Sequence, residues 1–233
     1  MIYKRNSLTR IGVSASAVLT ALVLLSPIAA TAKEEIAQQT HDGLVLIPDR
    51  KAAMAYVDPE ADFSGYNKVM ILDCFVAFKK GWQKEHQRAG SHIRVSSSDM
   101  EEIKVAAADL FREVFAEELS KDGGYEIVDT AAEDVLLVRP AIIDLDVAAP
   151  DRNSSPGRSA TFTTESGAAT IFIELYDSVT GDILARAADR KTAGRVGGYL
   201  SYSNRVTNTA DARRMMRGWA KSLRERLDEY HGK

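Results

Sequence analysis

The chain has one cysteine, Cys74, among its 233 residues. A single cysteine cannot form a disulfide within the chain, so no disulfide framework supports the fold. If the apolar stretch 68–78 is one strand, Cys74 shares a face with four apolar residues: Met70, Leu72, Val76 and Phe78. We expect a buried core thiol, and the alternatives are a reactive thiol or a disulfide-linked dimer.

The glycine and histidine patterns of common catalytic sites are also missing. There is no Gly-x-Ser-x-Gly elbow and no P-loop, and residues 194–198 resemble a dinucleotide-binding pattern only loosely. His86 and His92 lack the spacing of a zinc motif, and His41 and His231 are isolated. We expect no catalytic, cofactor-binding or metal-binding residue, with a loop-built site at His86 and His92 as the remaining alternative.

Carboxylates are the one set of acid–base groups that the sequence brings near one another. Five lie on or beside predicted strands: Asp144, Asp146, Glu174, Asp177 and Asp189. Two of them could form a catalytic pair, which would make the protein an envelope hydrolase. We favour structural roles instead, in which Asp177 caps a turn and Asp189 pairs with a neighbouring arginine.

The overall composition is that of a folded domain, with 45% hydrophobic and 27% charged residues. It excludes a disordered chain and a polytopic membrane protein. The first 32 residues differ from the rest. Three basic residues, Lys4, Arg5 and Arg10, precede an apolar run over residues 11–25 and small residues at 30–32. This pattern predicts a signal peptide, because the apolar run is shorter than the about 20 residues of a membrane span. The alternative is an uncleaved anchor.

Cleavage of this segment would change the charge of the chain. It removes three of the 30 basic residues and none of the 33 acidic ones, which leaves a net charge of about −6. This balance argues against nucleic acid and anionic lipid surfaces as partners. No cysteine stands at the cleavage site to accept a lipid. We therefore expect a periplasmic protein without a transmembrane span after signal cleavage, and the sequence leaves its oligomeric state open.

Residues 33–66 read as an irregular N-terminal arm, and residues 67–233 as one α/β domain. Strands are predicted at 68–78, 125–128 and 134–147, where Pro140 suggests a bulge or an edge. Residues 168–189 read as a hairpin that turns at Gly181. A helix begins at a capping box of Ser98 and Glu101, and the last helix covers 209–230. These elements predict an α+β fold: a mostly antiparallel sheet with two long helices packed on it.

Two predicted long loops, 79–95 and 193–208, are the best candidates for function. Their aromatic residues and histidines form a possible interaction surface: Trp82, His86, His92, Tyr199 and Tyr202. Such residues in loops suit contacts with an envelope protein or a glycan. The leading hypothesis is thus a non-catalytic binding or adaptor module. A self-associating structural protein, joined through an exposed sheet edge, is a further alternative.

Several stretches together resemble a bacterial family known as domain of unknown function 3313. They are residues 62–66 (DFSGY) with the strand after them, 122–128 (DGGYEIV), 134–141 (DVLLVRPA), 174–186 (ELYDSVTGDILAR) and 219–220 (WA). The order of these stretches carries the resemblance. It implies an exported or outer-membrane-anchored protein with no assigned activity, although this chain lacks the lipidation cysteine of the lipoprotein members.

Overall fold

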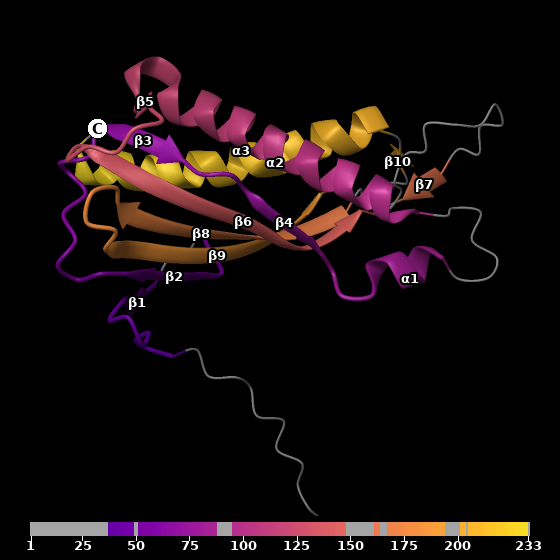
Figure 1. Cartoon of the computed structure of the whole chain (residues 1–233), viewed down its shortest axis with the longest axis horizontal. Coiled ribbons are helices and arrows are strands. Elements are labelled where there is room, and N and C mark those ends of the chain that lie inside the picture. Colours follow the sequence, from indigo (N-terminus) through magenta and orange to yellow (C-terminus); the bar gives the residue numbers. More distant parts are fainter. Residues whose placement is uncertain are drawn as a thin grey trace, which may run out of the picture. The chain divides into compact units, whose positions relative to one another are not determined.

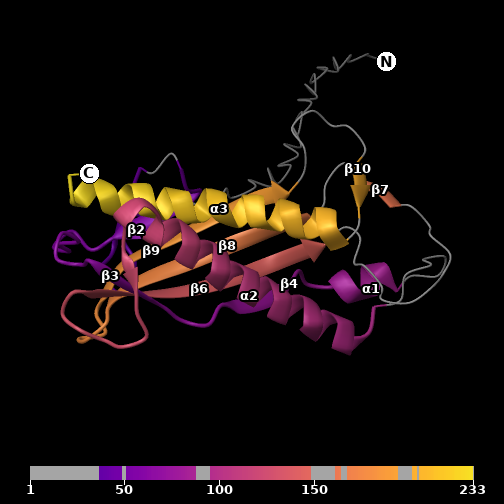
Figure 2. The same cartoon turned by 90° about the horizontal axis from the view of Figure 1, so that it is seen from above.

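The fold consists of a mixed sheet with the two long helices on one of its faces (Figure 1, Figure 2). The computed structural model describes residues 37–48, 51–87, 95–147, 161–163, 167–193, 201–203 and 205–232. The expected signal peptide lies outside these residues. Ala37–Lys233 form one compact unit, and its sheet and helices make the single α+β domain that the sequence predicts.

The main sheet has eight strands in the order β1-β2-β9-β8-β6-β3-β5, with β4 also paired to β6. Their bounds are β1 Val45–Ile47, β2 Met54–Val57, β3 Lys68–Ile71, β4 Phe75–Phe78, β5 Glu126–Ile127, β6 Val135–Val147, β8 Gly167–Asp177 and β9 Ile183–Ala193. A second sheet pairs β7 (Thr161–Thr163) with β10 (Ser201–Ser203).

The main sheet is mixed, which corrects the expectation of a mostly antiparallel one. Strands β1, β2, β9, β8 and β6 pair antiparallel, whereas β3 runs parallel to both β5 and β6, and β4 runs parallel to β6. The physical reason is the long helix α2 (Ser97–Ser120), which follows β3 and β4 and precedes β5 and β6. A helical crossover of this kind returns the chain in the same direction and so produces parallel pairing.

The N-cap of helix α2 lies two residues before the predicted one. Ser96 is the N-cap: its Oγ accepts a hydrogen bond from the Asp99 amide at 3.1 Å, and the Asp99 carboxylate accepts one from the Ser96 amide at 2.8 Å. Residues 96–98 are all serine, so a capping box could pair Ser96 with Asp99 or Ser98 with Glu101. The box that forms is the one between Ser96 and Asp99. A capping box is therefore present, but with different partners.

The end of α2 is closed by the second long helix, α3 (Arg205–Tyr230). Arg224 of α3 donates from Nη1 to the carbonyl oxygens of Leu119 and Lys121, each at 3.0 Å. The same two carbonyls also accept from the amides of Tyr125 and Gly124, so Arg224 adds a cation to the backbone hydrogen bonds that close this end of the helix. Gly124 follows, and a Cβ there would lie 2.2 Å from the Leu119 oxygen. Only glycine can occupy position 124, because it has no Cβ.

The core lies between the two helices and one face of the sheet. On α2 the rings of Phe111 and Phe115 stack with centroids 3.9 Å apart, and both are fully buried. From α3, Met216, Trp219 and Leu227 enter the same cluster. The sheet contributes alternate residues of its central strands, among them Val69, Leu136, Val138, Ile171 and Ile173. This alternation fixes which sheet face meets the helices.

The hairpin of β8 and β9 forms as predicted. The Gly181 amide donates to the Asp177 oxygen at 3.1 Å, and Gly181 has a φ of 75°. The Asp177 carboxylate accepts from the amides of Val179 and Thr180, so it does cap the turn. β9 continues to Ala193, beyond the predicted end at residue 189.

Three segments contain more regular structure than the sequence predicts. The N-terminal arm includes β1 and β2, which extend the sheet beside β9. The predicted loop 79–95 contains the short helix α1 (Trp82–His86). Helix α3 begins at Arg205 rather than at residue 209, and β10 precedes it.

The predicted strand 68–78 is broken at residues 72–74 into β3 and β4. Both pieces pair with β6: β3 reaches Val138, and β4 resumes at Ala141. Pro140 lies between these two positions and has no N–H to give to a neighbour. The proline is thus accommodated in the middle of β6 because the strand beside it is interrupted there.

Candidate functional site

The face of the main sheet opposite α2 and α3 is the most distinctive surface of the described residues. Both long helices lie on the same side of the sheet, and the views of Figure 1 and Figure 2 agree on this arrangement. We call the opposite side the uncovered face. Among the described residues, the turn of 40–43 reaches its β9 side through Asp42, and no helix as long as α2 or α3 lies over it.

An apolar row crosses this face over five strands. Register partners follow one another from β2 to β4: Met54, Ala188, Phe172, Ala141 and Phe75. Four strand spacings of about 4.8 Å make this row about 19 Å long. Phe75 is 64% exposed, and the other four are half-buried. An exposed aromatic ring at the end of an apolar row is characteristic of a contact surface rather than of a solvated sheet face.

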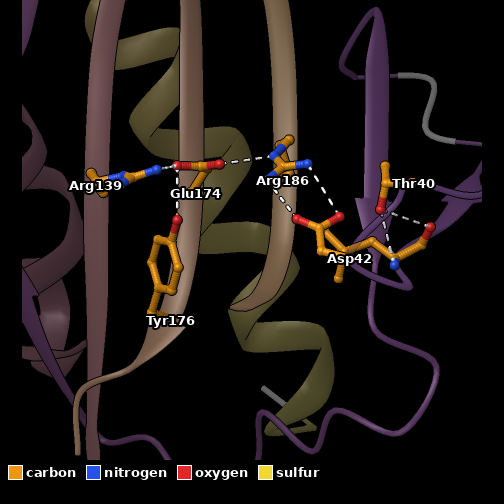
Figure 3. Close-up of polar contacts among 7 residues, drawn as sticks. Thr40, Asp42, Arg139, Glu174, Tyr176 and Arg186 are labelled. Carbon is orange, nitrogen blue, oxygen red and sulfur yellow. Dashed lines mark hydrogen bonds and ion pairs between the residues drawn. The ribbon is translucent and has the colours of Figure 1, made fainter. Parts of the chain in front are cut away.

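A charged row runs beside the apolar one. Arg139 on β6, Glu174 on β8 and Arg186 on β9 are register partners, and Figure 3 shows their side chains pointing toward one another. Glu174 is only 3% exposed. It accepts hydrogen bonds from Arg139 Nε and Arg186 Nε, both at 2.8 Å, from Tyr176 Oη at 3.0 Å, and from Arg139 Nη2.

The row ends in the turn before β1. Arg186 Nη2 donates to Asp42 Oδ2 at 2.8 Å. The guanidinium of Arg186 therefore joins the carboxylate of Glu174 to that of Asp42, which lies 144 residues before Arg186 in the chain, as Figure 3 shows. The network fastens the N-terminal strands to the hairpin.

The pKa values of these groups follow from this arrangement. Burial alone would raise the pKa of Glu174, but the hydrogen bonds from Arg139, Arg186 and Tyr176 outweigh it and lower the pKa below its usual value. The hydrogen bond from Thr40, with that from Arg186, lowers the pKa of Asp42 to about 2. Both carboxylates are therefore charged at neutral pH. The network therefore consists of ion pairs, and neither carboxylate holds a proton that it could donate.

A shallow hollow lies where the two rows meet, bordered by Leu72, Phe75, Pro140, Phe172, Arg139 and Glu174. The Arg139 side chain remains 56% exposed although it is bound to Glu174. The hollow therefore combines apolar rings with an accessible guanidinium. Aromatic residues, methionine and arginine are the types enriched in protein–protein interfaces.

Of the five residues in the surface predicted from the loops, Trp82 is the one whose side chain the structure describes. Trp82 is 1% exposed, its ring stacks on Phe78 with centroids 4.4 Å apart, and its Nε1 donates to the Val147 oxygen at 3.3 Å. It anchors α1 against the end of the sheet and offers no exposed ring. His86 lies on α1 and Tyr202 on β10. His92 and Tyr199 lie outside the described residues.

The candidate catalytic carboxylates do not converge. Glu174 lies on the uncovered face, whereas Asp189 lies on the helix side, where Trp219 Nε1 donates to it at 2.9 Å. Asp144 is exposed at a bulge of β6, with a φ of 52°, and Asp146 pairs with Lys79 at 3.4 Å. Glu174 and Asp189 therefore cannot form a catalytic pair with each other. Within the described residues, no group of three or more His, Cys, Asp or Glu side chains could hold a metal ion.

The uncovered face was not among the surfaces predicted from sequence. Residues 68–78 are apolar on both faces, which predicts a strand covered on two sides. The described residues cover one side only, and among them Leu72 and Phe75 remain exposed. Arg139 gives a weak signal: it is a charged residue inside an otherwise apolar strand, but its register partner cannot be read from sequence.

Comparisons with known proteins bear on the family and on little else. The chain matches no curated protein. A PelC dodecamer from Paraburkholderia phytofirmans is similar at 12% identity and a TM-score of 0.35, over 69% of this chain and 91% of that one. A putative neuraminyllactose-binding hemagglutinin homolog from Helicobacter pylori is similar at 11% identity and a TM-score of 0.33, over 72% and 89%. At these values neither similarity bears on function.

Among the described residues, no helix has both the length and the hydropathy of a membrane span. The model of a protein family matches residues 39–223, which is most of the chain and nearly all of its two-layer domain. The match agrees with the resemblance carried by the hairpin and the strands before it. The chain belongs to the family described as protein of unknown function (DUF3313).

Proposed function

We propose that this protein is an exported, non-catalytic binding module of the cell envelope, and that it docks an envelope protein on the uncovered face of its sheet. The apolar row that ends in Phe75 is the observation that carries this proposal. A two-layer domain normally keeps its outer sheet face polar, because that face meets water. Here five register partners in a row are apolar.

The chemistry of the face indicates a protein partner rather than a glycan. Phe75, Phe172 and Met54 supply apolar and aromatic contact, and Arg139 presents part of its guanidinium next to them. A matching surface would carry apolar side chains with a carboxylate placed to reach Arg139. The charged row fixes Arg139 in position, since Glu174 holds both its Nε and its Nη2.

Self-association through a sheet edge receives less support. The edge strands β1 and β5 are three and two residues long. Very short edge strands are one way in which proteins avoid pairing with further chains. A second copy docked on the uncovered face remains a distinct outcome, which light scattering of the purified protein detects.

Two experiments test the proposal. Fractionation of cells that express the full chain should place it in the periplasm with residues 1–32 removed, and retention in the cytoplasm would contradict export. For binding, the purified protein is compared with Phe75→Asp and Val105→Asp as bait for envelope extracts. Val105 is a matched control, because it is 59% exposed but lies on α2. Loss of a retained envelope protein in Phe75→Asp alone supports the proposal, and equal retention by all three baits contradicts it.

A further inference from the structure

A second concave site lies on the other side of the sheet, between the C-terminal half of α3 and strands β2 and β9. We call it the α3 cleft. Its volume is about 290 Å³, near the lower end of the range of about 300–1,000 Å³ for small-molecule pockets. Its lining is mainly apolar, from both the sheet and the helix. The proposed function does not use this site.

The cleft exists because the sheet carries alanines where α3 passes over it. Ala55 on β2 and Ala187 on β9 are register partners, and Ala185 lies two residues before Ala187. On the adjacent strand β8 the corresponding positions are Ile173 and Leu175, which reach the core. Small side chains on two neighbouring strands thus leave a space under the helix. An apolar space in a core costs stability unless something fills it.

The walls and the mouth of the cleft differ in polarity. Trp219 and Leu223 of α3 form the wall opposite the alanines. The rings of Phe63 and Tyr230, tilted against each other with centroids 4.8 Å apart, also line the cleft. The charged residues of the lining are Lys51, Arg186, Asp189, Arg226 and Glu229. Of the three cations, Arg186 is bound by Glu174 and Asp42 on the uncovered face, which leaves Lys51 and Arg226 as the cations to consider for a ligand. Each binds a carboxylate next to it: Lys51 binds Glu225 at 2.6 Å, and Arg226 binds Glu229 at 2.9 Å.

These two ion pairs are exposed, so an anionic ligand can compete with them. The four side chains are between 38% and 57% exposed, and exposed ion pairs of this kind contribute little to stability. A ligand carboxylate can therefore replace Glu225 or Glu229 at little cost. An apolar cleft of this size, with cations in its lining, has the chemistry of a site for one acyl chain with an acidic head group.

We propose that the α3 cleft binds a single-chain amphiphile, with its acyl chain against Ala55, Ala185 and Ala187 and its carboxylate at Lys51 and Arg226. Laurate is the probe, and dodecanol is the same chain without the charge. Titration calorimetry and native mass spectrometry of the purified protein should show one laurate per chain. Ala187→Leu, which fills the cleft, should weaken laurate binding at least tenfold. Ala106→Leu adds the same side chain to an exposed position of α2 and should leave the affinity unchanged.

The head-group assignment has its own test. Arg226→Gln should weaken laurate severalfold and leave dodecanol unchanged. If Ala187→Leu fails to fold by circular dichroism, Ala52→Trp takes its place, because Ala52 lines the cleft and is half-buried. Absence of laurate binding, several laurates per chain, or equal affinity in the filled and wild-type clefts would each overturn the proposal. Equal losses of laurate and dodecanol in Arg226→Gln would overturn the role of the cations.

Discussion

The carboxylates of Glu174 and Asp189 lie on opposite faces of one β-hairpin. Glu174 binds Arg139 and Arg186 on the uncovered face, whereas Asp189 accepts from Trp219 on the helix side. Their positions follow from the strand period: Asp189 is the register partner of Ile171, and Glu174 that of Arg186. The two acids therefore cannot act on one substrate. Their roles are to fix an arginine row and to hold α3.

Replacement of Glu174 should destabilise the fold clearly. Glu174→Gln removes the charge between two arginines, and Arg186, 18% exposed at its side chain, loses one of its two ionic partners. Removing one member of a buried pair costs about 3–5 kcal/mol, and since Arg139 is half exposed we expect about 2–3 kcal/mol here. Urea unfolding measures this loss. Glu117→Gln is the control, because Glu117 and Arg217 form an exposed pair at 3.7 Å, worth about 0–1 kcal/mol. Equal losses in the two variants would refute the role of the network.

Stability should fall in acid because of the same row. The pKa values of Glu174 and Asp42 are lower in the folded protein than their usual 4.5 and 3.8. Their contribution is thus complete above those usual values and is lost as the pH falls through the folded pKa values. The urea midpoint should be flat from pH 7 to about 5 and should decrease below that. Glu174→Gln should show a shallower decrease, and an unchanged slope would mean that other carboxylates dominate.

Trp82 should matter for folding. Its ring is buried against Phe78 and its Nε1 reaches the Val147 oxygen. We expect Trp82→Ala to cost about 3–5 kcal/mol, because it leaves a large cavity. Trp82→Phe keeps most of the stacking and should cost less. Thermal unfolding distinguishes them, and a fully stable Trp82→Ala with altered partner binding would restore its role in an interaction surface.

Cys74 should be unreactive in the folded protein. Burial raises the pKa of its thiol to about 12, so the thiolate is scarce at pH 8. We expect slow labelling by a thiol reagent in buffer and rapid labelling in urea. The same experiment bears on a disulfide-linked dimer, which would migrate as a larger species without reductant. Rapid labelling of the native protein would contradict the core placement.

Much of the fold could be predicted from local patterns. The hairpin turn at Gly181, the apolar stripes of both long helices and the stop at residues 122–124 each depend on neighbours in sequence. The parallel direction of β3, β4 and β5 could not be predicted from local patterns, because parallel pairing depends on where the α2 crossover returns the chain. Strands β1 and β2 are short, and they form by long-range pairing of β2 with β9 and of β1 with β2.

The uncovered face was harder to predict, because the interruption at residues 72–74 changes which side chains lie on each face of the strand. Read as continuous, residues 68–78 place Cys74 on one face with Met70 and Leu72. The interruption at 72–74 shifts the alternation, so that Cys74 and Val76 face the core while Phe75 is exposed. The shift is set by Pro140 on the neighbouring strand, which no local pattern in 68–78 reveals.

Photo-crosslinking from position 75 tests the central claim most directly. A photoreactive phenylalanine analogue replaces Phe75 in one full-length chain and Val105 in another, and both are irradiated in living cells. We expect a discrete adduct with one envelope protein from position 75, reduced by the second substitution Arg139→Glu, and none from position 105. Adducts of equal yield from both positions, or an adduct from 105 alone, would contradict the uncovered face as the binding surface.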